Sequence, residues 1–233
     1  MLLDELRVLL AIGLAGLLLM LRLDARRFGG AEYGPGPDDS ESGSVAMRIA
    51  WPAMAVALTA VIAVTLPSGA ADVGIDRSTF VSAATIVLSL LGCGLGIGAV
   101  LLLGWLADGR WPPDLLGLRE VPAAALDAAG TALVDELTFR GVLMGLLLTA
   151  GVPALLAFLI QVLAYGIATR LGASSRTLGL LVEDLLLGAA MGVLTLLSGG
   201  IAAAVVVHAA TRFAALAVRD MPRSLTPWTV DRP

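Results

Sequence analysis

The sequence predicts an all-α fold, a polytopic transmembrane helical bundle with about seven spans. Of the 233 residues, 58% are hydrophobic and 15% are charged, whereas soluble domains average about 45–50% apolar and about 25% charged residues. A soluble fold of this length could not bury so much apolar surface. Runs of about 20 apolar residues cross a bilayer as helices, because a helix satisfies its own backbone polar groups.

Seven apolar runs divide the chain. They cover residues 6–23, 49–67, 80–106, 123–149, 152–169, 178–198 and 200–218. The first run is kept as a membrane helix, because Asp4 and Glu5 precede it where a signal peptide would carry cations. Residues 24–47 form the only long polar loop, and their Gly, Pro, Ser and acid content predicts flexibility. We therefore divide the chain into N-terminal helices with this loop (1–119), a four-span core (120–218) and a cytoplasmic tail (219–233).

The distribution of arginine predicts the orientation in the membrane. All fifteen cationic residues are arginine, and seven spans place the termini on opposite sides. One side carries only Arg7 and Arg77. The other side carries eleven arginines: Arg22, Arg26, Arg27, Arg48, Arg110, Arg119, Arg170, Arg176, Arg219, Arg223 and Arg232. The positive-inside rule makes that second side cytoplasmic. We expect an integral protein of the cell (plasma) membrane with its N-terminus outside and its C-terminus inside.

Several functional classes are excluded by composition. A single cysteine, Cys93, and a single histidine, His208, leave no disulfide framework, no cysteine-based metal site and no histidine pair for zinc. The net charge of −4 gives no basic surface for nucleic acid. No cofactor is firmly implied and no metal ligand set is expected, although a single oxygen-rich site could hold a divalent cation weakly.

The fourth span carries the charged residues that best mark a functional site. Asp135, Glu136 and Arg140 all fall inside it, and charges at this depth usually face the bundle interior, form pairs and serve a function. Glu136 and Arg140 are four residues apart with the acid first, the favourable order for a helical ion pair. Asp135 lies about 100° around the helix from Glu136. One carboxylate can thus be neutralised while the other points elsewhere, an arrangement suited to acid or base chemistry.

The seventh span supplies a second pair of polar residues. His208 and Arg212 are four residues apart and share a helix face. At about 1.5 Å per residue, His208 and Asp135 both reach the middle of the membrane and can meet. A structural reading remains open, in which the charges clamp helices together and the histidine is a hydrogen-bonded packing residue.

The motif DELTFRG, from Asp135 to Gly141, resembles the E-E-x-x-x-R-G motif of the CPBP family of CAAX prenyl proteases and bacteriocin-processing membrane endopeptidases. Residues 185–213 are similar to the last two helices of that family, which close on H-x-x-x-N. The resemblance covers roughly residues 120–218. It implies the family's helical bundle and a site in which an acid activates water while other side chains position it and stabilise the oxyanion.

The chain departs from the family pattern at several site positions. The first acid is Asp135 rather than glutamate, whereas the second acid and the arginine match. Tyr165, in the stretch FLIQVLAYGIA, is the best match for the family's middle histidine. His208 matches the last histidine, and Arg212 stands in place of asparagine. Tyrosine and arginine both donate hydrogen bonds, so an oxyanion site can survive these changes. Tyrosine is a poor base at neutral pH, and Arg212 would compete for the carboxylates.

We favour a CPBP-like intramembrane endopeptidase, a hydrolase of CAAX-protease type, with reduced activity allowed by the substitutions. Its expected partners are membrane lipid and a peptide or lipidated protein tail. The predicted roles are a general base (Asp135 or Glu136), a residue that fixes the base (Arg140) and oxyanion donors (His208, Tyr165 and Arg212). The alternative is a catalytically inactive protein of the same fold that binds a lipidated tail or a membrane partner. A third interpretation is a small proton-linked transporter. The lack of an inverted repeat in the sequence argues against it.

Overall fold

Helices make up nearly all of the described part of the chain. The computed structural model describes residues 2–23, 45–66, 69–108, 115, 117–172 and 178–218. Within these ranges the only β-type pairing is an isolated bridge between Leu115 and Val218. The predicted all-α class is confirmed. Residues 24–44 of the predicted flexible loop, and the tail at 219–233, lie outside the described ranges.

Long helices fall on each of the predicted spans. They are α1 (Leu2–Leu23), α2 (Val45–Thr65), α4 (Ala83–Asp108), α7 (Ala154–Gly172), α8 (Leu178–Ser198) and α9 (Ala202–Ala217). The fourth span contains three consecutive segments, namely α5 (Val121–Asp135), a π-helix η4 (Glu136–Leu143) and α6 (Met144–Thr149). Two short elements, η3 (Gly69–Val73) and α3 (Arg77–Phe80), connect α2 to α4. Residues 45–47, predicted as loop, are the first residues of α2.

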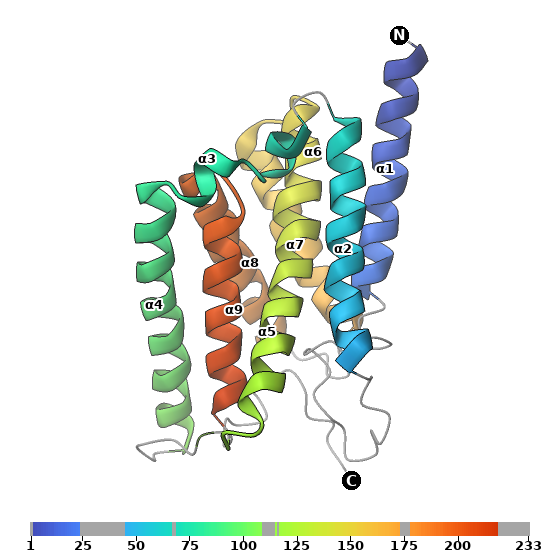
Figure 1. The fold of residues 1–233 in the computed structure, drawn as a ribbon. Helices are drawn as coiled ribbons and strands as arrows, with labels where there is room; N and C mark the ends of the chain where they lie inside the picture. The colour runs from blue at the N-terminus through green and yellow to red at the C-terminus, as the bar shows by residue number, and fades with distance from the viewer. Residues whose placement is uncertain are drawn as a thin grey trace.

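The helices run alternately up and down the bundle. In Figure 1, α1 and α4 stand at opposite edges, with α9, α5 and α2 between them. α4 packs on α9, α9 on α5, α2 on α5 and on α1, and α7 on α8. α1 begins at one end of the bundle and α9 finishes at the other.

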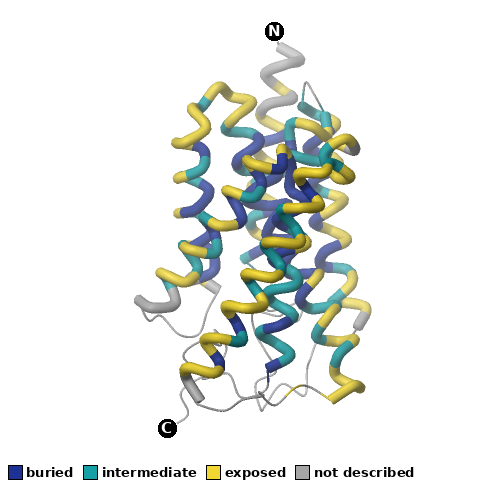
Figure 2. The backbone as a smooth tube through the Cα atoms, turned by 90° about the vertical axis from the view of Figure 1, so that its left-hand side faces the viewer, coloured by how far each residue is buried: buried dark blue, intermediate teal, exposed yellow. Residues whose placement is uncertain are grey.

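The outer surface is apolar and the interior carries charge. Leu90 and Leu95 on α4 are 70% and 76% exposed, whereas Asp135 and Glu136 are fully buried. Figure 2 shows exposed positions along the outer helix faces and buried positions toward the bundle centre. Among the described residues, three helices are long and apolar enough to cross a membrane, within Ala46–Thr65, Ala83–Leu106 and Leu181–Ser198. Charges inside and leucines outside identify an integral membrane protein, because lipid solvates the leucines and the bundle shields the charges.

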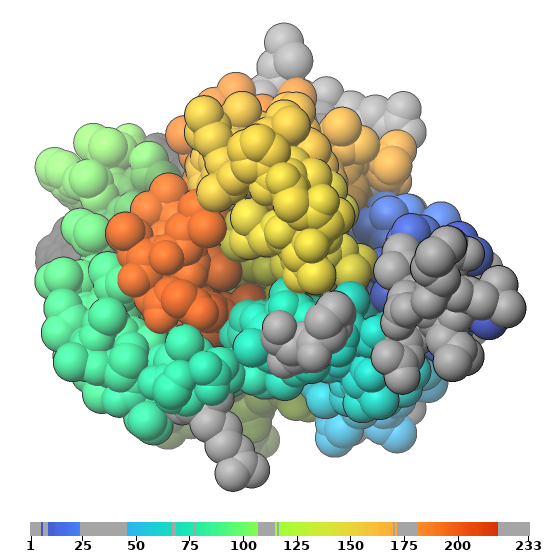
Figure 3. Space-filling view, turned by 90° about the horizontal axis from the view of Figure 1, so that it is seen from above, coloured from blue at the N-terminus to red at the C-terminus, as the bar shows by residue number. Residues whose placement is uncertain are grey.

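The η3 segment closes one end of the bundle over the fourth span. A Cβ atom on Gly145 would overlap the carbonyl oxygen of Asp72, and the backbone N–H of Ile201 donates to the carbonyl of Gly74 at 3.1 Å. Val73 is fully buried beneath this contact. Figure 3 looks onto this end, where atoms of η3, the α6–α7 turn and the start of α9 lie against one another. The interior of the bundle is therefore covered by backbone packing on this side.

Candidate functional site

The two acids lie where the α-helical geometry of the fourth span changes. Asp135 is the last residue of α5, and Glu136 is the first residue of the π-helix η4. Every residue from Glu136 to Val142 is buried. π-Helical segments are rare and frequently occur at functional sites. The sequence gives no indication of this segment, which the apolar periodicity predicts as ordinary α-helix.

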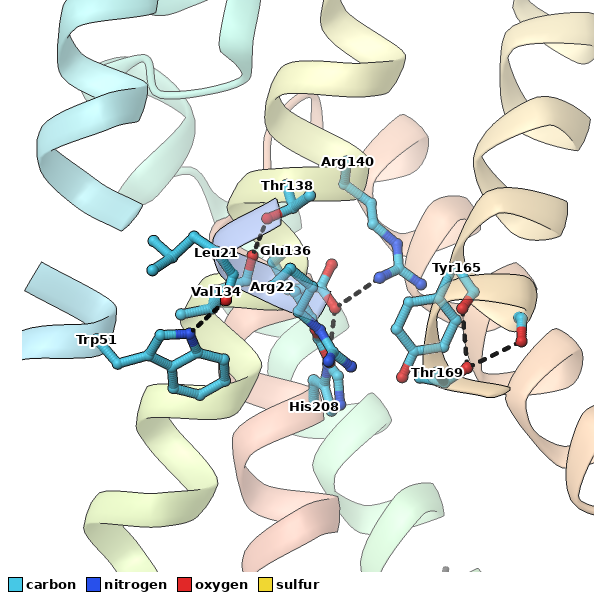
Figure 4. Close-up of polar contacts among 12 residues, drawn as sticks. Leu21, Arg22, Trp51, Val134, Glu136, Thr138, Arg140, Tyr165, Thr169 and His208 are labelled. Carbon is cyan, nitrogen blue, oxygen red and sulfur yellow. Dashed lines mark hydrogen bonds and ion pairs between the residues drawn. The ribbon is translucent and has the colours of Figure 1, made fainter. Parts of the chain in front are cut away.

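Glu136 contacts two side chains through one carboxylate oxygen. Its Oε1 accepts a hydrogen bond from Nη1 of Arg140 at 3.2 Å and lies 2.8 Å from Nδ1 of His208 (Figure 4). The predicted ion pair four residues apart is present, and both side chains are fully buried. His208 reaches the carboxylate pair across the bundle, as the depth estimate predicts, and the acid that it meets is Glu136.

The contact between Glu136 and His208 determines which ring nitrogen carries the proton. A carboxylate only accepts hydrogen bonds, so Nδ1 of His208 must donate. In a neutral imidazole the other nitrogen, Nε2, then has a free lone pair. Nε2 is buried and has no hydrogen-bond partner among the described residues. In this tautomer, Nε2 is the ring nitrogen with an available lone pair.

Arg140 is held by three different helical segments. Its Nη1 binds Glu136 within η4, and its Nη2 donates to the carbonyl of Gly188 on α8 at 3.0 Å. Its guanidinium carbon lies 4.5 Å from the ring centre of Tyr165 on α7, within the range of a cation–π contact. The side-chain amide of Gln161, also on α7, donates to the same Gly188 carbonyl at 3.3 Å. Arg140 thus links the carboxylate to α7 and α8.

Tyr165 lies at the site, although it sits on a different helix from the acids and the histidine. Its ring packs edge-on against Phe139 with a centroid distance of 5.4 Å, and against His208 at 6.4 Å. It is 1% exposed. The residue that the sequence matched to the missing middle histidine therefore lies beside both Arg140 and His208.

Arg22 corrects the sequence-based count of arginines. Its side chain is fully buried, and its Nε donates to Oδ1 of Asp135 across the bundle. It therefore does not belong with the cytoplasmic arginines, which leaves ten of the eleven on that side against two. A buried carboxylate without a cation is costly, so Arg22, in the last turn of α1, turns inward rather than toward the cytoplasm. The orientation with the C-terminus inside stays a prediction.

Arg212 acts on a carboxylate outside the predicted pair. It is partly buried, and its charge acts on Asp127, which also binds Nη1 of Arg48 at 2.6 Å. Asp127 lies eight residues before Asp135 in α5, which is about two helical turns. This second charged group connects α2, α5 and α9 at some distance from the acids of the motif.

Three buried polar atoms of the acids and the histidine have no partner in the described part of the chain. Oδ2 of Asp135, Oε2 of Glu136 and Nε2 of His208 have no hydrogen-bond partner among the described residues. Leaving such an atom unpaired costs about 1–3 kcal/mol, so each of them is an atom to which a water or a polar substrate group can bind. Within the described ranges, no group of three His, Cys, Asp or Glu side chains could hold a metal ion.

Two site residues escaped the sequence analysis. The sequence does indicate that a second cation is needed, because two buried acids with only Arg140 beside them would leave one negative charge unpaired. Arg22 is that cation in the structure. Gln161 could also have been singled out, since it is the only side-chain amide in the apolar stretch FLIQVLAYGIA. Neither signal identifies the partner, because the partners lie on other helices.

These features define a helical membrane protein with an intramembrane site made of two acids, two arginines, a histidine and a tyrosine. Residues 118–214 match the family model described as "type II CAAX prenyl endopeptidase Rce1-like". The resemblance to the CPBP family is therefore confirmed over that segment, which runs from just before α5 into α9 and supports a CPBP-type intramembrane endopeptidase at the level of the family. Searches among curated proteins and among solved structures gave no match.

Proposed function

We propose that the protein is an intramembrane endopeptidase that hydrolyses a peptide bond in a prenylated protein tail at the cell (plasma) membrane. The observation that carries this proposal is the buried contact between Glu136 and His208, at 2.8 Å. The match of residues 118–214 supports the reaction class and the prenylated substrate. The unpaired Nε2 of His208 and Oε2 of Glu136 support water as the nucleophile.

In the proposed reaction, His208 is the general base. Its Nε2 takes a proton from a water molecule, and the resulting hydroxide attacks the scissile carbonyl carbon. Glu136 holds the ring through Nδ1 and stabilises the imidazolium, as the acid does in a serine protease triad. The imidazolium then returns the proton to the leaving amine. This assignment replaces the expected general base, Asp135 or Glu136, with the histidine that one of those acids orients.

Two further residues have proposed roles beside the general base. Arg140 binds both Glu136 and the Gly188 carbonyl, so it fixes the carboxylate against rotation. We propose the Tyr165 hydroxyl as an oxyanion donor, because the ring lies beside His208 and a phenol donates without changing its charge. Arg212, whose charge acts on Asp127, is a weaker candidate for the same role.

Peptide cleavage in detergent tests this proposal. The purified protein is incubated with a pool of farnesylated and unmodified peptides with CAAX-type C-termini, and products are identified by mass spectrometry. We expect cleavage of farnesylated peptides by the wild type, its loss in His208→Ala and Glu136→Gln, and its retention in Arg48→Gln. Full activity of His208→Ala would rule out the proposed base.

A non-cleaving binder of lipidated tails is the second candidate. Its specific support is that each acid of the motif is already paired with an arginine, Asp135 with Arg22 and Glu136 with Arg140. Retained binding of a farnesylated peptide by folded wild-type protein, with no product over hours, would favour this candidate over the endopeptidase.

A further inference from the structure

We propose that Arg22 is a positioning residue of the site, supplied by the N-terminal helix from outside the segment that matches the family. In this proposal Arg22 neutralises Asp135 and holds it apart from the reaction, which leaves Glu136 and His208 as the reactive pair. The inference rests on the proposed endopeptidase activity. It adds α1 to a site whose other members all lie within residues 118–214.

The geometry fixes Arg22 in place. Its side chain is fully buried, and its Nε binds Oδ1 of Asp135. The carbonyl of the preceding residue, Leu21, accepts a hydrogen bond from Nε1 of Trp51 on α2 at 3.1 Å, and Trp51 is 2% exposed. α1 also packs against η4 and α7, the segments that carry Glu136 and Tyr165. Figure 4 shows Arg22 entering the group of Glu136 and His208 from the Trp51 side.

The charges of the buried group balance only when Arg22 is counted. Asp135 and Glu136 carry two negative charges, and Arg22 and Arg140 carry two positive charges. Each acid of the motif thus has its own guanidinium, and Glu136 also contacts the ring of His208. Without Arg22, Asp135 would be a fully buried carboxylate with no cation bound to it among the contacts of the described residues, which is costly.

The composition of the motif agrees with this role. Aspartate replaces the first glutamate of the family motif at position 135, and the structure shows that carboxylate bound to the guanidinium of Arg22 from another helix. The two acids of the motif therefore have different functions. Asp135 receives the counter-ion, and Glu136 orients the histidine.

A double-mutant comparison tests the inference on the full-length protein in detergent. Arg22→Gln and Asp135→Asn are made singly and together, because Gln and Asn can keep a hydrogen bond across the same gap without charge. The matched control is the set Arg48→Gln, Asp127→Asn and their combination, an arginine–aspartate pair that is 20% and 17% exposed. Each variant is measured for thermal unfolding and for kcat and KM on the farnesylated peptide that the wild type cleaves fastest.

We expect each single change in the Arg22 pair to lower Tm by on the order of 10 °C, because it leaves one buried charge unpaired. Arg22→Gln should lower kcat about 100-fold with little change in KM. The double variant should recover most of the Tm and at least a tenth of the wild-type kcat. The control set should change Tm by only a few degrees, because partly exposed pairs contribute little.

Three results would overturn the inference. A double variant that regains its Tm but stays inactive would make Asp135 itself part of the chemistry. Equal effects of Arg22→Gln on kcat and KM would reduce Arg22 to a folding role. Tm losses that simply add in the double variant would show that the two residues are not coupled. If the folded wild type cleaves no peptide, the proposed function fails instead, and the coupling in Tm still decides whether Arg22 neutralises Asp135.

Discussion

Nδ1 of His208 lies 2.8 Å from Oε1 of Glu136, although 72 positions separate the two residues in the sequence. The contact joins α9 to the π-helix η4, and both side chains are almost completely buried. It serves two purposes that can be separated by experiment, since it satisfies a buried carboxylate and also orients the second ring nitrogen.

His208→Asn separates these two purposes. An asparagine amide can donate to Glu136 in place of Nδ1, but it offers no base in place of Nε2. We expect Tm to stay within a few degrees of the wild type and kcat to fall by about 10²–10⁴. His208→Leu should in addition lose about 1–3 kcal/mol of stability, because Glu136 is left with one contact fewer. Thermal unfolding and peptide cleavage on the same samples distinguish the two variants, and equal Tm values for both would contradict this reading.

Arg140→Lys tests the bridging role of the guanidinium. A lysine keeps the charge but cannot bind Glu136 and the Gly188 carbonyl together while facing the Tyr165 ring. We expect a loss of about 1–3 kcal/mol in the free energy of unfolding and a fall in kcat, because the carboxylate that orients the histidine becomes mobile. Chemical or thermal unfolding measures the first effect and single-turnover cleavage the second. Wild-type values for both would show that a point charge is sufficient.

Gly145→Ala tests the closed end of the bundle. A Cβ at this position would overlap the Asp72 carbonyl oxygen of η3, and overpacking of this kind costs about 1–3 kcal/mol. Gly94→Ala on α4 is the matched control, because it lies in a helix with nothing within 4 Å of the added atom. Alanine should stabilise that helix by up to about 1 kcal/mol. We expect a lower Tm for the first variant only, together with easier labelling of a cysteine placed at Val73.

Cysteine labelling tests the orientation of the bundle. Val81 and Leu118 are 77% and 91% exposed, and they lie just before α4 and just before α5, two helices that begin at opposite ends of the bundle in Figure 1. In a Cys93→Ala background, we expect Val81→Cys in intact cells to react with a thiol reagent that cannot cross membranes. Leu118→Cys should react only after the membrane is opened, because the arginine bias places its side in the cytoplasm. The reverse pattern would invert the topology, and labelling of both sites in intact cells would change the number of crossings.

The sequence predicts the helices well, because a run of apolar residues long enough to cross a membrane has few other solutions. It also predicts the pairing of Glu136 with Arg140, since four-residue spacing on one helix is a local property. It does not predict the partner of Arg22, because that contact depends on how α1 and the fourth span are placed relative to each other in the bundle. Nor does the sequence predict that the charge of Arg212 acts on Asp127. To predict a contact between two helices, the rotation of each helix about its own axis must be known. The apolar periodicity of the sequence defines that rotation only coarsely.

The π-helix at Glu136–Leu143 has a consequence for how this chain can change its length. Each turn of a π-helix holds more residues than a turn of α-helix, so η4 contains spare chain relative to the helices before and after it. Removing one residue there would let the segment revert to regular α-helix, and the side chains after the deletion would keep their former directions. Removing one residue from α5 would instead turn Glu136 and Arg140 by about 100° relative to the helix before them. We therefore expect a one-residue deletion in η4 after Arg140 to disturb the bundle less than one in the regular helix that leads up to the site, because it leaves the spacing of Glu136 and Arg140 unchanged.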